Sequence, residues 1–329
     1  MTDEKYNQLI KQVNLSSLKN KSLFITGGTG FFGYWLLNLF SILNHLDFNI
    51  TITLLSRNPD FFLEKHPQFK NINWLTFIKG DVINYSYPET KFDMIIHGAA
   101  DTSQLLYEKP MQIFEDIIFG TKHVLNHAEF CKVRRVLVIS SGAVYGEVSS
   151  DTEYITEEIN TSPITNKIEN AYGEAKRASE TLATCFAKEK NVEIIIARCF
   201  AFVGMGIGPH LIINILLQQA KNEEKIILKS SGKARRSFLH GRDLAIWLLK
   251  ILIDGEAGDI YNVGSDLSYT IKKLAELIRN EMAPEKEIIF SNTLKNEQRI
   301  NYVPSIEKAK KIGLNVWTTL NDAILETKN

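Results

Sequence analysis

Tyr172 and Lys176 could together move a proton during a redox reaction. They stand four residues apart in the segment AYGEAKRASE, and this spacing places both side chains on one face of a helix. A tyrosine hydroxyl is too weak an acid to serve as a base near neutrality, because its pKa is about 10, and a neighbouring lysine ammonium favours the phenolate. The pair predicts a tyrosine that exchanges a proton with an alcohol or carbonyl while a hydride moves.

Ser141 could complete this group. The apolar run VLVIS ends at Ser140 and leads directly into Ser141 and Gly142. A hydroxyl at the carboxyl end of a parallel strand lies at the edge where ligands bind. We expect Ser141 to bond the reacting substrate oxygen and to orient it toward Tyr172. His97, in IIHGAA, is expected to be a structural residue at a strand end beside the cofactor.

A glycine-rich loop predicts the cofactor. The segment SLFITGGTGFFGYWLL places Gly27, Gly30 and Gly33 between a strand and a helix. The first glycine permits a tight turn, the second lets the backbone approach a pyrophosphate, and the third lets helix and strand pack closely. The amides and the positive dipole end of the helix would then face the phosphates.

The end of the second strand chooses between cofactors. An acid there would accept hydrogen bonds from the adenosine ribose, but this strand ends in Ser56 and Arg57. An arginine and a hydroxyl suit a 2′-phosphate, so of NAD and NADP the sequence favours NADP, unless Arg57 is only a solvent-facing loop residue. Asp81 is placed to accept a bond from the adenine amino group. The expected cofactor-binding residues are Gly27, Thr29, Gly30, Phe31, Phe32, Gly33, Ser56, Arg57, Asp81, Val82, Ala99, Ala100, Tyr172 and Lys176.

Strands and helices alternate around these motifs. The predicted strands are Ser22–Thr26, Ile50–Leu55, Trp74–Lys79, Met94–His97, Val136–Ser140 and Val192–Arg198, and the predicted helices are Phe31–Leu46, Met111–Cys131 and Tyr172–Glu189. Strands that are apolar on both faces and alternate with helices predict an α/β fold, a Rossmann-type doubly wound parallel sheet. Antiparallel hairpins would need turn pairs at short spacing, which the sequence lacks.

The chain divides into three parts. Residues 1–20 read as a polar, partly helical lead-in, residues 21–200 as the NAD(P)-binding domain, and residues 201–329 as a smaller mixed α/β lobe for the substrate, with some exchange of chain between the lobes. The expected elements of the smaller lobe are amphipathic helices at His210–Asn222, Asp243–Ile253 and Ile271–Asn280, and strands at Ile226–Lys229, Ile260–Val263 and Glu287–Phe290.

Composition excludes several other classes. Lys and Arg number 38, as do Asp and Glu, so no basic field invites nucleic acid or a membrane surface. The apolar stretch Leu244–Ile253 is too short to span a bilayer. Three scattered cysteines without a CxxC pair read as reduced thiols and give no metal site. We expect a cytoplasmic protein without a membrane anchor.

The motifs resemble those of the extended short-chain dehydrogenases, specifically the nucleotide-sugar NAD(P)-dependent epimerase/dehydratase family. TGGTGFFG, GDV, HGAA, SSGAVYG and YGEAK occur in the family's order. ARCFAFVG is similar to its R-x-x-N-x-x-G segment, ARRSFLHGRDLA to its R-D-F-I-H-V-x-D segment, and YNVGS and VPSIEKAKKIGL also match. The resemblance covers Lys21 to about Leu314.

The resemblance implies roles for single residues. Ser141, Tyr172 and Lys176 fall on the family's catalytic triad, and Arg236 falls on the arginine that grips the nucleotide diphosphate. The implied substrate-binding residues are Ser141, Gly142, Tyr172, Ala201 and Arg236. The smaller lobe would hold a nucleotide sugar, and a homodimer would form through the helices at Met111–Cys131 and Tyr172–Glu189.

Three positions depart from the family pattern. The Asp-Glu pair with which dehydratases eliminate water is replaced by Gly142 and Ala143, so 4,6-dehydratase activity is not expected. The asparagine of the R-x-x-N segment is Ala201, and the asparagine of the N-V-x-G-T pattern is Ile117. These changes affect the expected substrate and leave the hydride machinery intact.

The leading hypothesis is an NAD(P)-dependent nucleotide-sugar epimerase that works by reversible hydride transfer at a sugar carbon, C4 first, with Tyr172 as acid and base. A complete triad without the acid pair is its usual signature. Three alternatives stay open: an NADPH-dependent nucleotide-sugar 4-keto reductase, a reductase of a small carbonyl compound, and a non-catalytic NAD(P)-sensing regulator. Regulators of that kind tend to lose the tyrosine or the lysine, and both are present here.

Overall fold

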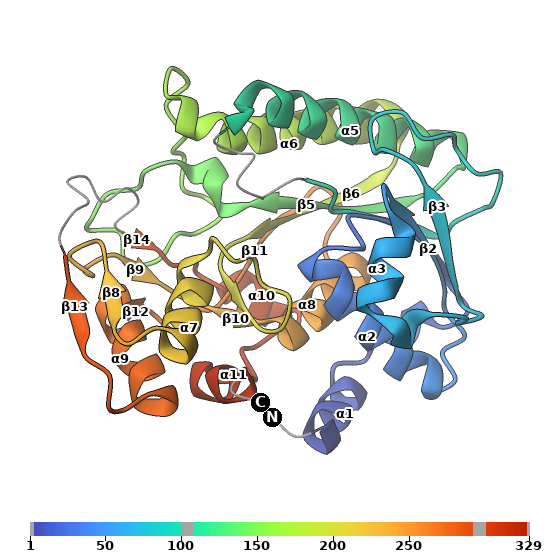
Figure 1. The fold of residues 1–329 in the computed structure, drawn as a ribbon. Helices are drawn as coiled ribbons and strands as arrows, with labels where there is room; N and C mark the ends of the chain where they lie inside the picture. The colour runs from blue at the N-terminus through green and yellow to red at the C-terminus, as the bar shows by residue number, and fades with distance from the viewer. Residues whose placement is uncertain (1–2, 101–107, 292–300, 328–329) are drawn as a thin grey trace.

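A parallel sheet forms the large unit of the protein. The computed structural model describes residues 3–100, 108–291 and 301–327, and within these ranges seven parallel strands pair in the order β11-β6-β5-β4-β1-β2-β3 (Figure 1). The strands are β1 (Ser22–Thr26), β2 (Thr51–Ser56), β3 (Leu75–Lys79), β4 (Met94–His97), β5 (Arg135–Ser141), β6 (Glu193–Cys199) and β11 (Ile260–Val263). The doubly wound parallel sheet expected from the sequence is confirmed.

The strand order reverses between β1 and β4. The chain runs outward from β1 through β2 and β3, and then returns to the other side of β1 as β4. In such sheets a crevice opens at the carboxyl ends of the two strands that flank the switch point, and ligands bind there. Thr26 and His97 end these two strands and are paired in register, so the glycine loop that follows Thr26 lies at this crevice.

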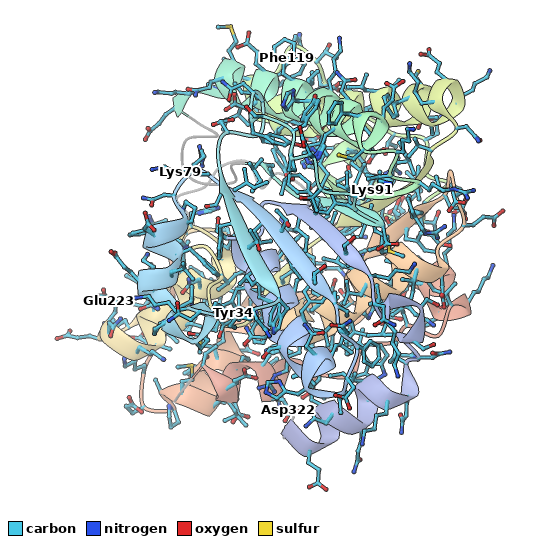
Figure 2. The ribbon with its side chains drawn as sticks, turned by 90° about the vertical axis from the view of Figure 1, so that its right-hand side faces the viewer. Tyr34, Lys79, Lys91, Phe119, Glu223 and Asp322 are labelled. Carbon is cyan, nitrogen blue, oxygen red and sulfur yellow. The ribbon has the colours of Figure 1, made fainter. Side chains whose placement is uncertain are left out.

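Helices cover both faces of the sheet. Figure 1 shows α5 (Pro110–Phe130) and α6 (Ala171–Lys190) side by side on one face, with α2 (Phe31–His45) and α8 (Gly241–Asp254) on the other. The short α3 (Pro59–Lys65) follows β2. Figure 2 shows Phe119 on the outer surface of the α5–α6 layer, away from the sheet. Strands covered on both sides explain the continuous apolar runs in the sequence.

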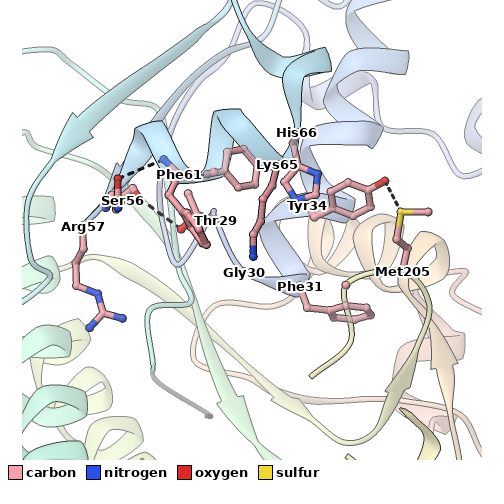
Figure 3. A pocket seen from close by; sticks show the side chains of 13 residues that line it. Thr29, Gly30, Phe31, Tyr34, Ser56, Arg57, Phe61, Lys65, His66 and Met205 are labelled. Carbon is pink, nitrogen blue, oxygen red and sulfur yellow. Dashed lines mark hydrogen bonds between the residues drawn. The ribbon is translucent and has the colours of Figure 1, made fainter. Parts of the chain in front are cut away.

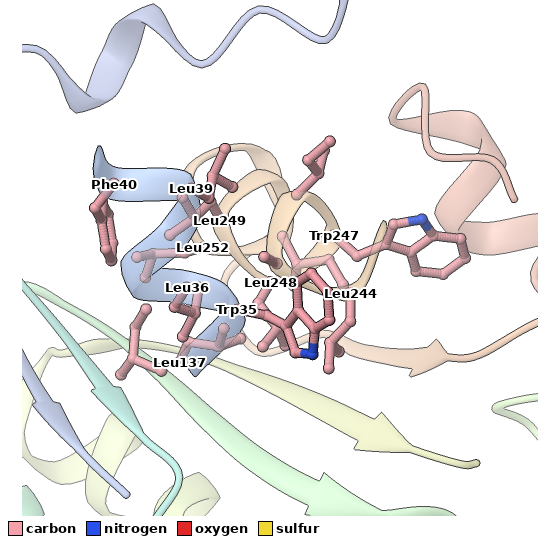
Figure 4. Packing of buried hydrophobic residues seen from close by; sticks show 14 of the residues in the cluster. Trp35, Leu36, Leu39, Phe40, Leu137, Leu244, Trp247, Leu248, Leu249 and Leu252 are labelled. Carbon is pink, nitrogen blue, oxygen red and sulfur yellow. The ribbon is translucent and has the colours of Figure 1, made fainter. Parts of the chain in front are cut away.

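The main core lies between the sheet, α2 and α8. Trp35, Leu36 and Leu39 of α2 pack against Leu248 and Leu252 of α8, all of them buried (Figure 4). The sequence suggested an amphipathic helix of the smaller lobe at this position, and both parts of that expectation are wrong. α8 is buried on nearly every side because α2 and the sheet cover one face and the C-terminal segment covers another.

A buried carboxylate ties the C-terminal segment to α8. Asp243 is fully buried, and it accepts hydrogen bonds from the backbone N–H groups of Trp317 and Thr318 at 2.8 Å each and from the Thr318 hydroxyl at 2.7 Å. Trp247 donates from its indole nitrogen to the carbonyl of Asn315 at 2.9 Å. These bonds satisfy the carboxylate, which would otherwise be costly to bury.

The N-terminal segment is also part of this core. α1 (Asp3–Gln12) buries Tyr6, Leu9 and Ile10 against the same cluster. Lys250 of α8 donates to the carbonyl of Asn14, just after α1, at 3.4 Å. The segment is helical as expected, but it carries an apolar face and does not behave as a polar lead-in.

The smaller unit has a separate core, centred on Leu216, Leu274 and Ile278. Its helices and short strands are α7 (Ile212–Asn222), α9 (Ile271–Met282), α11 (Leu320–Glu326), β7 (Phe202–Val203), β8 (Ile226–Leu228), β9 (Arg235–Arg236), β10 (Leu239–His240), β12 (Tyr269–Thr270), β13 (Ile288–Phe290) and β14 (Asn301–Tyr302). β11 was expected here, but it pairs with β6 at the edge of the large sheet. The short α10 (Glu307–Lys311) packs against β11 and joins the main core through Ala309. The chain therefore crosses between the units more than once after residue 200.

Candidate active site

The glycines of the loop after β1 are required for different reasons. Gly27 has φ +73°, and a Cβ there would lie 2.5 Å from the carbonyl oxygen of Gly98. A Cβ on Gly33 would lie 2.0 Å from the carbonyl oxygen of Gly28, so this glycine lets α2 pack onto the loop. Gly30 differs, because the nearest atom to a Cβ there is the Gly27 oxygen at 3.5 Å. The space beside Gly30 is open, as a close approach to a pyrophosphate requires.

The N-terminus of α2 fits an anion. Gly30 is its N-cap, and no side chain among the described residues caps the helix. The amides of the first turn therefore keep donors that a phosphate can accept, and the helix dipole adds positive potential at the same place. Together with the open space beside Gly30, these donors fit the pyrophosphate of a dinucleotide.

A buried hydrogen-bond chain holds the end of β4 against the loop. His97 lies 2.8 Å from the Thr26 hydroxyl through Nδ1 and 3.0 Å from the Thr121 hydroxyl through Nε2. Thr121 donates to the carbonyl of Ile117 at 2.7 Å, so it accepts the proton of Nε2, and Nδ1 then accepts from Thr26. The Thr26 oxygen accepts the N–H of Ala99 at 3.2 Å. This chain fixes Ala99 beside the glycine loop.

Burial lowers the pKa of His97 to about 3, and the charge of Lys176 acts in the same direction. His97 is therefore neutral over the physiological range, with both ring nitrogens engaged. It cannot serve as a general base, in agreement with the structural role expected from the sequence.

A cavity of about 470 Å³ opens beside the loop, between α2, α3 and the Met205–Gly206 turn. None of the thirteen described residues that line it is acidic; they are Thr29, Gly30, Phe31, Tyr34, Ser56, Arg57, Asn58, Phe61, Phe62, Lys65, His66, Met205 and Gly206. Ser56 and Thr29 approach through their hydroxyl oxygens at 3.5 Å. Figure 3 shows the side chain of Lys65 reaching from α3 toward Gly30.

The charge of this cavity comes from Arg57 and Lys65. The Lys65 ammonium lies 4.2 Å from the centre of the Phe61 ring, which holds it over the cavity wall. Partial burial lowers the pKa of His66, and the neighbouring Lys65 adds to this effect. His66 is then an uncharged wall residue near neutrality. The cavity is thus lined by two cations, Arg57 after β2 and Lys65 at the end of α3, and by the hydroxyls of Ser56 and Thr29.

Asp81 lies in the turn after β3. Its carboxylate accepts the N–H of Ile83 at 3.2 Å and so closes its own turn. The neighbouring Val82 packs on α5, where a Cβ on Gly120 would lie 2.9 Å from it. These contacts fix the turn. The bond of Asp81 to the adenine amino group and the contact of Val82 with the cofactor stay predictions.

Ser141 ends β5 and begins a 3-10 helix at Gly142–Tyr145. Its oxygen accepts the N–H of Ala143 at 3.1 Å. That bond uses a lone pair, so the hydroxyl proton stays available to a substrate oxygen. Only 9% of Ser141 is exposed. The preceding Ser140 is engaged elsewhere, because its hydroxyl donates to the carboxylate of Glu180 on α6.

Lys176 is held against the same strand. Its ammonium donates to the carbonyl of Ile139 at 2.8 Å, two residues before Ser141. Burial lowers its pKa to about 8, while Cys199 and Glu180 act in the opposite direction. The ammonium is the main form at neutral pH, and it titrates within reach of the working range.

Tyr172 is carried to the end of β5 by a close helix contact. A Cβ on the next residue, Gly173, would lie 2.7 Å from the carbonyl oxygen of Ala143, so only glycine lets α6 come this close. The Tyr172 side chain packs with Ala100 around a small cluster that includes Ile113 and Ile117. Because Ala100 follows the β4 end of the cofactor crevice, the tyrosine lies between that crevice and the Ser141 turn.

Phe200, which follows β6, and Tyr302 of β14 close the other side. A Cβ on Gly142 would lie 2.7 Å from the hydroxyl oxygen of Tyr302 and 2.9 Å from the Phe200 ring. The rings of Phe200 and Tyr302 are 4.7 Å apart, and the guanidinium of Arg236 lies 5.7 Å from the Tyr302 ring. β9 and β14 place Arg236 and Tyr302 opposite each other in register. Ala201 lies in the adjoining segment, where its carbonyl accepts the N–H of Leu239 at 3.0 Å.

The sequence missed three contributors to this site. Gly173 could have been noted, because it lies beside Tyr172 and a glycine inside a helix needs a reason. Glu180 lies two turns along α6 from Tyr172, but its partner Arg198 is on another strand, and spacing gives no sign of that pairing. Tyr302 had no signal, because β9 and β14 are 66 residues apart in the chain.

The described residues also limit other kinds of site. No group of three or more His, Cys, Asp or Glu side chains in residues 3–100, 108–291 and 301–327 is arranged to hold a metal ion. Over the same ranges, no helix has both the length and the apolar character needed to cross a bilayer.

A doubly wound parallel sheet with a glycine loop at its switch point, and a serine, a tyrosine and a lysine gathered beside it, defines a nicotinamide-dependent enzyme of the Rossmann type. Comparison with known proteins agrees. The chain belongs to the NAD dependent epimerase/dehydratase family, whose model matches residues 23–264.

A curated protein is similar to this chain in sequence, and two solved structures share its fold. UDP-glucuronic acid decarboxylase 6 of Arabidopsis thaliana is 28% identical over 301 residues, which cover 89% of this chain and 83% of that protein. A UDP-N-acetylglucosamine 4-epimerase from Methanobrevibacter ruminantium, solved with UDP-N-acetylmuramic acid, has a TM-score of 0.81 at 20% identity, covering 94% of this chain and 97% of that one. RMD from Pseudomonas aeruginosa, solved with NADPH, has a TM-score of 0.75 at 21% identity, covering 94% and 97%.

Proposed function

We propose that the protein is an NAD(P)-dependent nucleotide-sugar epimerase that acts by reversible hydride transfer at C4 of the sugar, with Tyr172 as acid and base. The observation that carries the proposal is the gathering of the Ser141 turn, the Tyr172 helix and the open side of Gly30 at one edge of the sheet. The aromatic wall that Tyr302 and Phe200 form beside Gly142 supplies a surface for a sugar ring.

Each residue has a stated task in this scheme. A nicotinamide dinucleotide, bound with its pyrophosphate at Gly30, would supply the hydride acceptor and donor. Ser141 donates a hydrogen bond from its hydroxyl to the reacting sugar oxygen. Tyr172 takes the proton of the sugar hydroxyl when the sugar carbon is oxidised. Tyr172 returns the proton when the carbon is reduced from the other face. Lys176 holds positive charge one helical turn away and favours the phenolate.

Arg236 is proposed to hold the diphosphate of the substrate. A guanidinium can donate two parallel bonds to phosphate oxygens, which a lysine ammonium cannot. Arg236 lies beside Tyr302 at the edge of the site, opposite the Ser141 turn. This arrangement would place the nucleotide in the smaller unit and the sugar over Gly142. The curated relatives include a UDP-glucuronic acid decarboxylase, a dTDP-D-glucose 4,6-dehydratase and a trifunctional dehydratase, epimerase and reductase, so the choice among reactions rests on the residues of this chain.

Dehydration is not part of the proposal. A carboxylate at position 142 would be needed beside the catalytic hydroxyl, and the position is Gly142. The hydroxyl of Tyr302 fills the space into which a side chain would extend. Ala143 likewise carries no acid. Elimination of water therefore lacks its general acid and base.

A second candidate is an NADPH-dependent 4-keto reductase. The observation in its favour is the acid-free cavity at the end of β2, where Arg57 and Lys65 provide two charges suited to a 2′-phosphate. We propose NADP as the preferred cofactor on the same ground. The two candidates differ in cofactor turnover: an epimerase regenerates its cofactor in each cycle, whereas a reductase consumes one equivalent for each sugar.

The test is a proton NMR assay of UDP-, dTDP-, CDP- and GDP-hexoses incubated with the protein and catalytic amounts of NAD or NADP. A C4 epimer formed in large excess over the cofactor supports the epimerase. Product formed only in proportion to added NADPH, from a 4-keto sugar, supports the reductase. Turnover of small carbonyl compounds that persists in an Arg236→Ala variant contradicts the nucleotide-sugar class, and dinucleotide binding without any turnover indicates a sensor.

A further inference from the structure

A buried ion pair lies behind the catalytic strand and outside the steps described so far. Glu180 of α6 and Arg198 of β6 form a two-pronged contact, with Arg198 Nε at 3.0 Å and Nη2 at 2.7 Å from the two carboxylate oxygens. The side chains are only 7% and 12% exposed. A buried ion pair of this kind is weak support for stability, because desolvation offsets much of its attraction. Its place in the molecule therefore calls for another explanation.

The pair touches the catalytic strand directly. The hydroxyl of Ser140 donates to the Glu180 carboxylate, and the ammonium of Lys176 donates to the carbonyl of Ile139 at 2.8 Å. Lys176 and Glu180 are four residues apart on α6, and Ile139 and Ser140 are consecutive on β5. Two adjacent points of α6 are thus fastened to two adjacent points of β5, immediately before Ser141.

The other side of the pair is anchored to the rest of the site. The Arg198 guanidinium lies 4.7 Å from the centre of the Tyr145 ring, in the 3-10 helix that follows Ser141. Tyr145 donates its hydroxyl proton to the side-chain oxygen of Asn262 on β11 at 2.8 Å. Asn262 in turn donates to the carbonyl of Ile155 at 2.8 Å. The ion pair therefore contacts the chain on both sides of Ser141, at Ser140 before it and at Tyr145 after it.

We propose that Glu180 is a positioning residue for the reaction. Arg198 holds the Glu180 carboxylate, and this carboxylate bonds Ser140. Glu180 thereby fixes α6 against β5 and sets the placement of Ser141 relative to Tyr172 and Lys176. The inference rests on the proposed hydride-transfer function of that site. Displacements of about 1 Å in such a group reduce rates strongly, because the reacting atoms must be aligned. Glu180 bonds Ser140 and Arg198 and does not line the cavity beside the glycine loop, so in this proposal it acts through its neighbours.

The carboxylate also acts on the charge of Lys176. The groups that influence Lys176 are Glu180 on its own helix and Cys199 on β6, both of which raise its pKa against the effect of burial. His97 on β4 faces the same charge and is neutral. Arg198 is paired with Glu180, so removing the carboxylate charge also leaves this guanidinium without its counter-charge. Loss of the Glu180 charge should therefore make Lys176 lose its proton at lower pH.

Three variants and one control test the proposal. Ser140→Ala removes the bond to β5 and keeps the ion pair, Glu180→Asp keeps the charge and shortens its reach, and Glu180→Gln removes the charge. The control is Glu129→Gln, because Glu129 forms an exposed ion pair with Lys190 at 2.8 Å and has the same chemical change. For each protein the readouts are the melting temperature, the affinity for NAD or NADP between pH 6 and 10 by calorimetry, and kcat and KM over the same range.

The expected result is a fall in kcat of at least about tenfold for Ser140→Ala, corresponding to a lost bond to a charged group, with KM for the sugar nucleotide nearly unchanged. Glu180→Gln should move the alkaline midpoint of kcat/KM and of cofactor affinity to lower pH, and Glu180→Asp should restore that midpoint. Glu129→Gln should behave as wild type in every readout.

Several outcomes would overturn the proposal. A Glu180→Gln protein that keeps the wild-type alkaline midpoint overturns the proposal even if its melting temperature falls. A glutamate with only a structural role would lower the melting temperature and leave that midpoint unchanged. If Glu180→Gln does not fold, Ser140→Ala decides: kcat within about twofold of wild type, with the wild-type melting temperature, contradicts the positioning role. Absence of dinucleotide binding in the wild type would instead remove the proposed function on which the inference rests.

Discussion

The space beside Gly30 is open, so the substitution Gly30→Ala should weaken cofactor binding with little effect on the stability of the fold. A Cβ added at Gly30 meets its nearest atom at 3.5 Å, an ordinary contact, and the residue has φ −94°, which alanine adopts freely. Alanine is a poorer N-cap than glycine, so Gly30→Ala should lower the free energy of unfolding by no more than about 1 kcal/mol. The added methyl group lies where the pyrophosphate must approach, so the affinity for NAD or NADP should fall at least about tenfold, or about 1.4 kcal/mol.

Gly33→Ala provides the matched contrast. Its Cβ would lie 2.0 Å from the carbonyl oxygen of Gly28, and the loop must move to accept it. Such overpacking lowers stability by about 1–3 kcal/mol or more. Gly33→Ala should therefore melt at a lower temperature without any ligand, whereas Gly30→Ala should not.

The assay is thermal unfolding with and without cofactor, supported by calorimetry. A cofactor concentration of 100 times the wild-type Kd stabilises the wild type by about 2.7 kcal/mol. At that concentration a tenfold weaker Gly30→Ala protein gains only about 1.4 kcal/mol. A Gly30→Ala protein that binds NAD and NADP with wild-type affinity would refute the placement of the pyrophosphate at this loop.

Three further predictions follow from charge, burial and exposure. The pKa of His97 is lowered to about 3 in the folded protein, so its contribution to stability is present above the unfolded value near 6.5 and is lost as the pH falls, at about 1.4 kcal/mol for each pH unit. In a His97→Gln protein the free energy of unfolding, measured with urea, should fall less steeply between pH 6 and 4 than in the wild type. An unchanged dependence on pH would count against this. Replacing Arg57 or Lys65 with Met should weaken the binding of 2′,5′-ADP about tenfold or more and leave that of 5′-AMP within about twofold, with exposed Lys70→Met as the control; equal losses for both nucleotides would contradict a 2′-phosphate site. Phe119 is 56% exposed on α5, and Phe119→Glu should convert the proposed homodimer to a monomer in light scattering, whereas a monomeric wild type would dismiss the dimer.

The parallel sheet and most of its strands could be predicted because the deciding information is local. Each strand of the large unit is a short apolar run flanked by a helix-forming segment, and a run apolar on both faces fits only a covered parallel sheet. The bounds of β1, β4 and β11 agree with the predicted strands. Those of α2 differ from the prediction by one residue at the C-terminal end, and those of α6 by one residue at each end. The glycine loop was found for the same reason, since all its determinants lie within seven residues.

The misplacements concern contacts distant in the chain. α8 was predicted to be amphipathic and contains Arg242, Asp243, Lys250 and Asp254. Asp243 is nevertheless buried, because the backbone N–H groups of Trp317 and Thr318 satisfy its carboxylate. β11 has the composition of any short strand, and its place beside β6 depends on a crossing of the chain between units. The register that brings Tyr302 over Gly142 is likewise set by pairing between remote segments.

The central claim is that Tyr172 moves the proton that accompanies hydride transfer on a nucleotide sugar. The most direct measurement compares wild type and Tyr172→Phe in the rate of sugar interconversion, followed by proton NMR with saturating cofactor and the sugar nucleotide that the wild type turns over. We predict a fall in kcat of about 100- to 10,000-fold, with KM, cofactor affinity and melting temperature close to wild type. A Tyr172→Phe protein that interconverts the sugar at the wild-type rate would contradict the account.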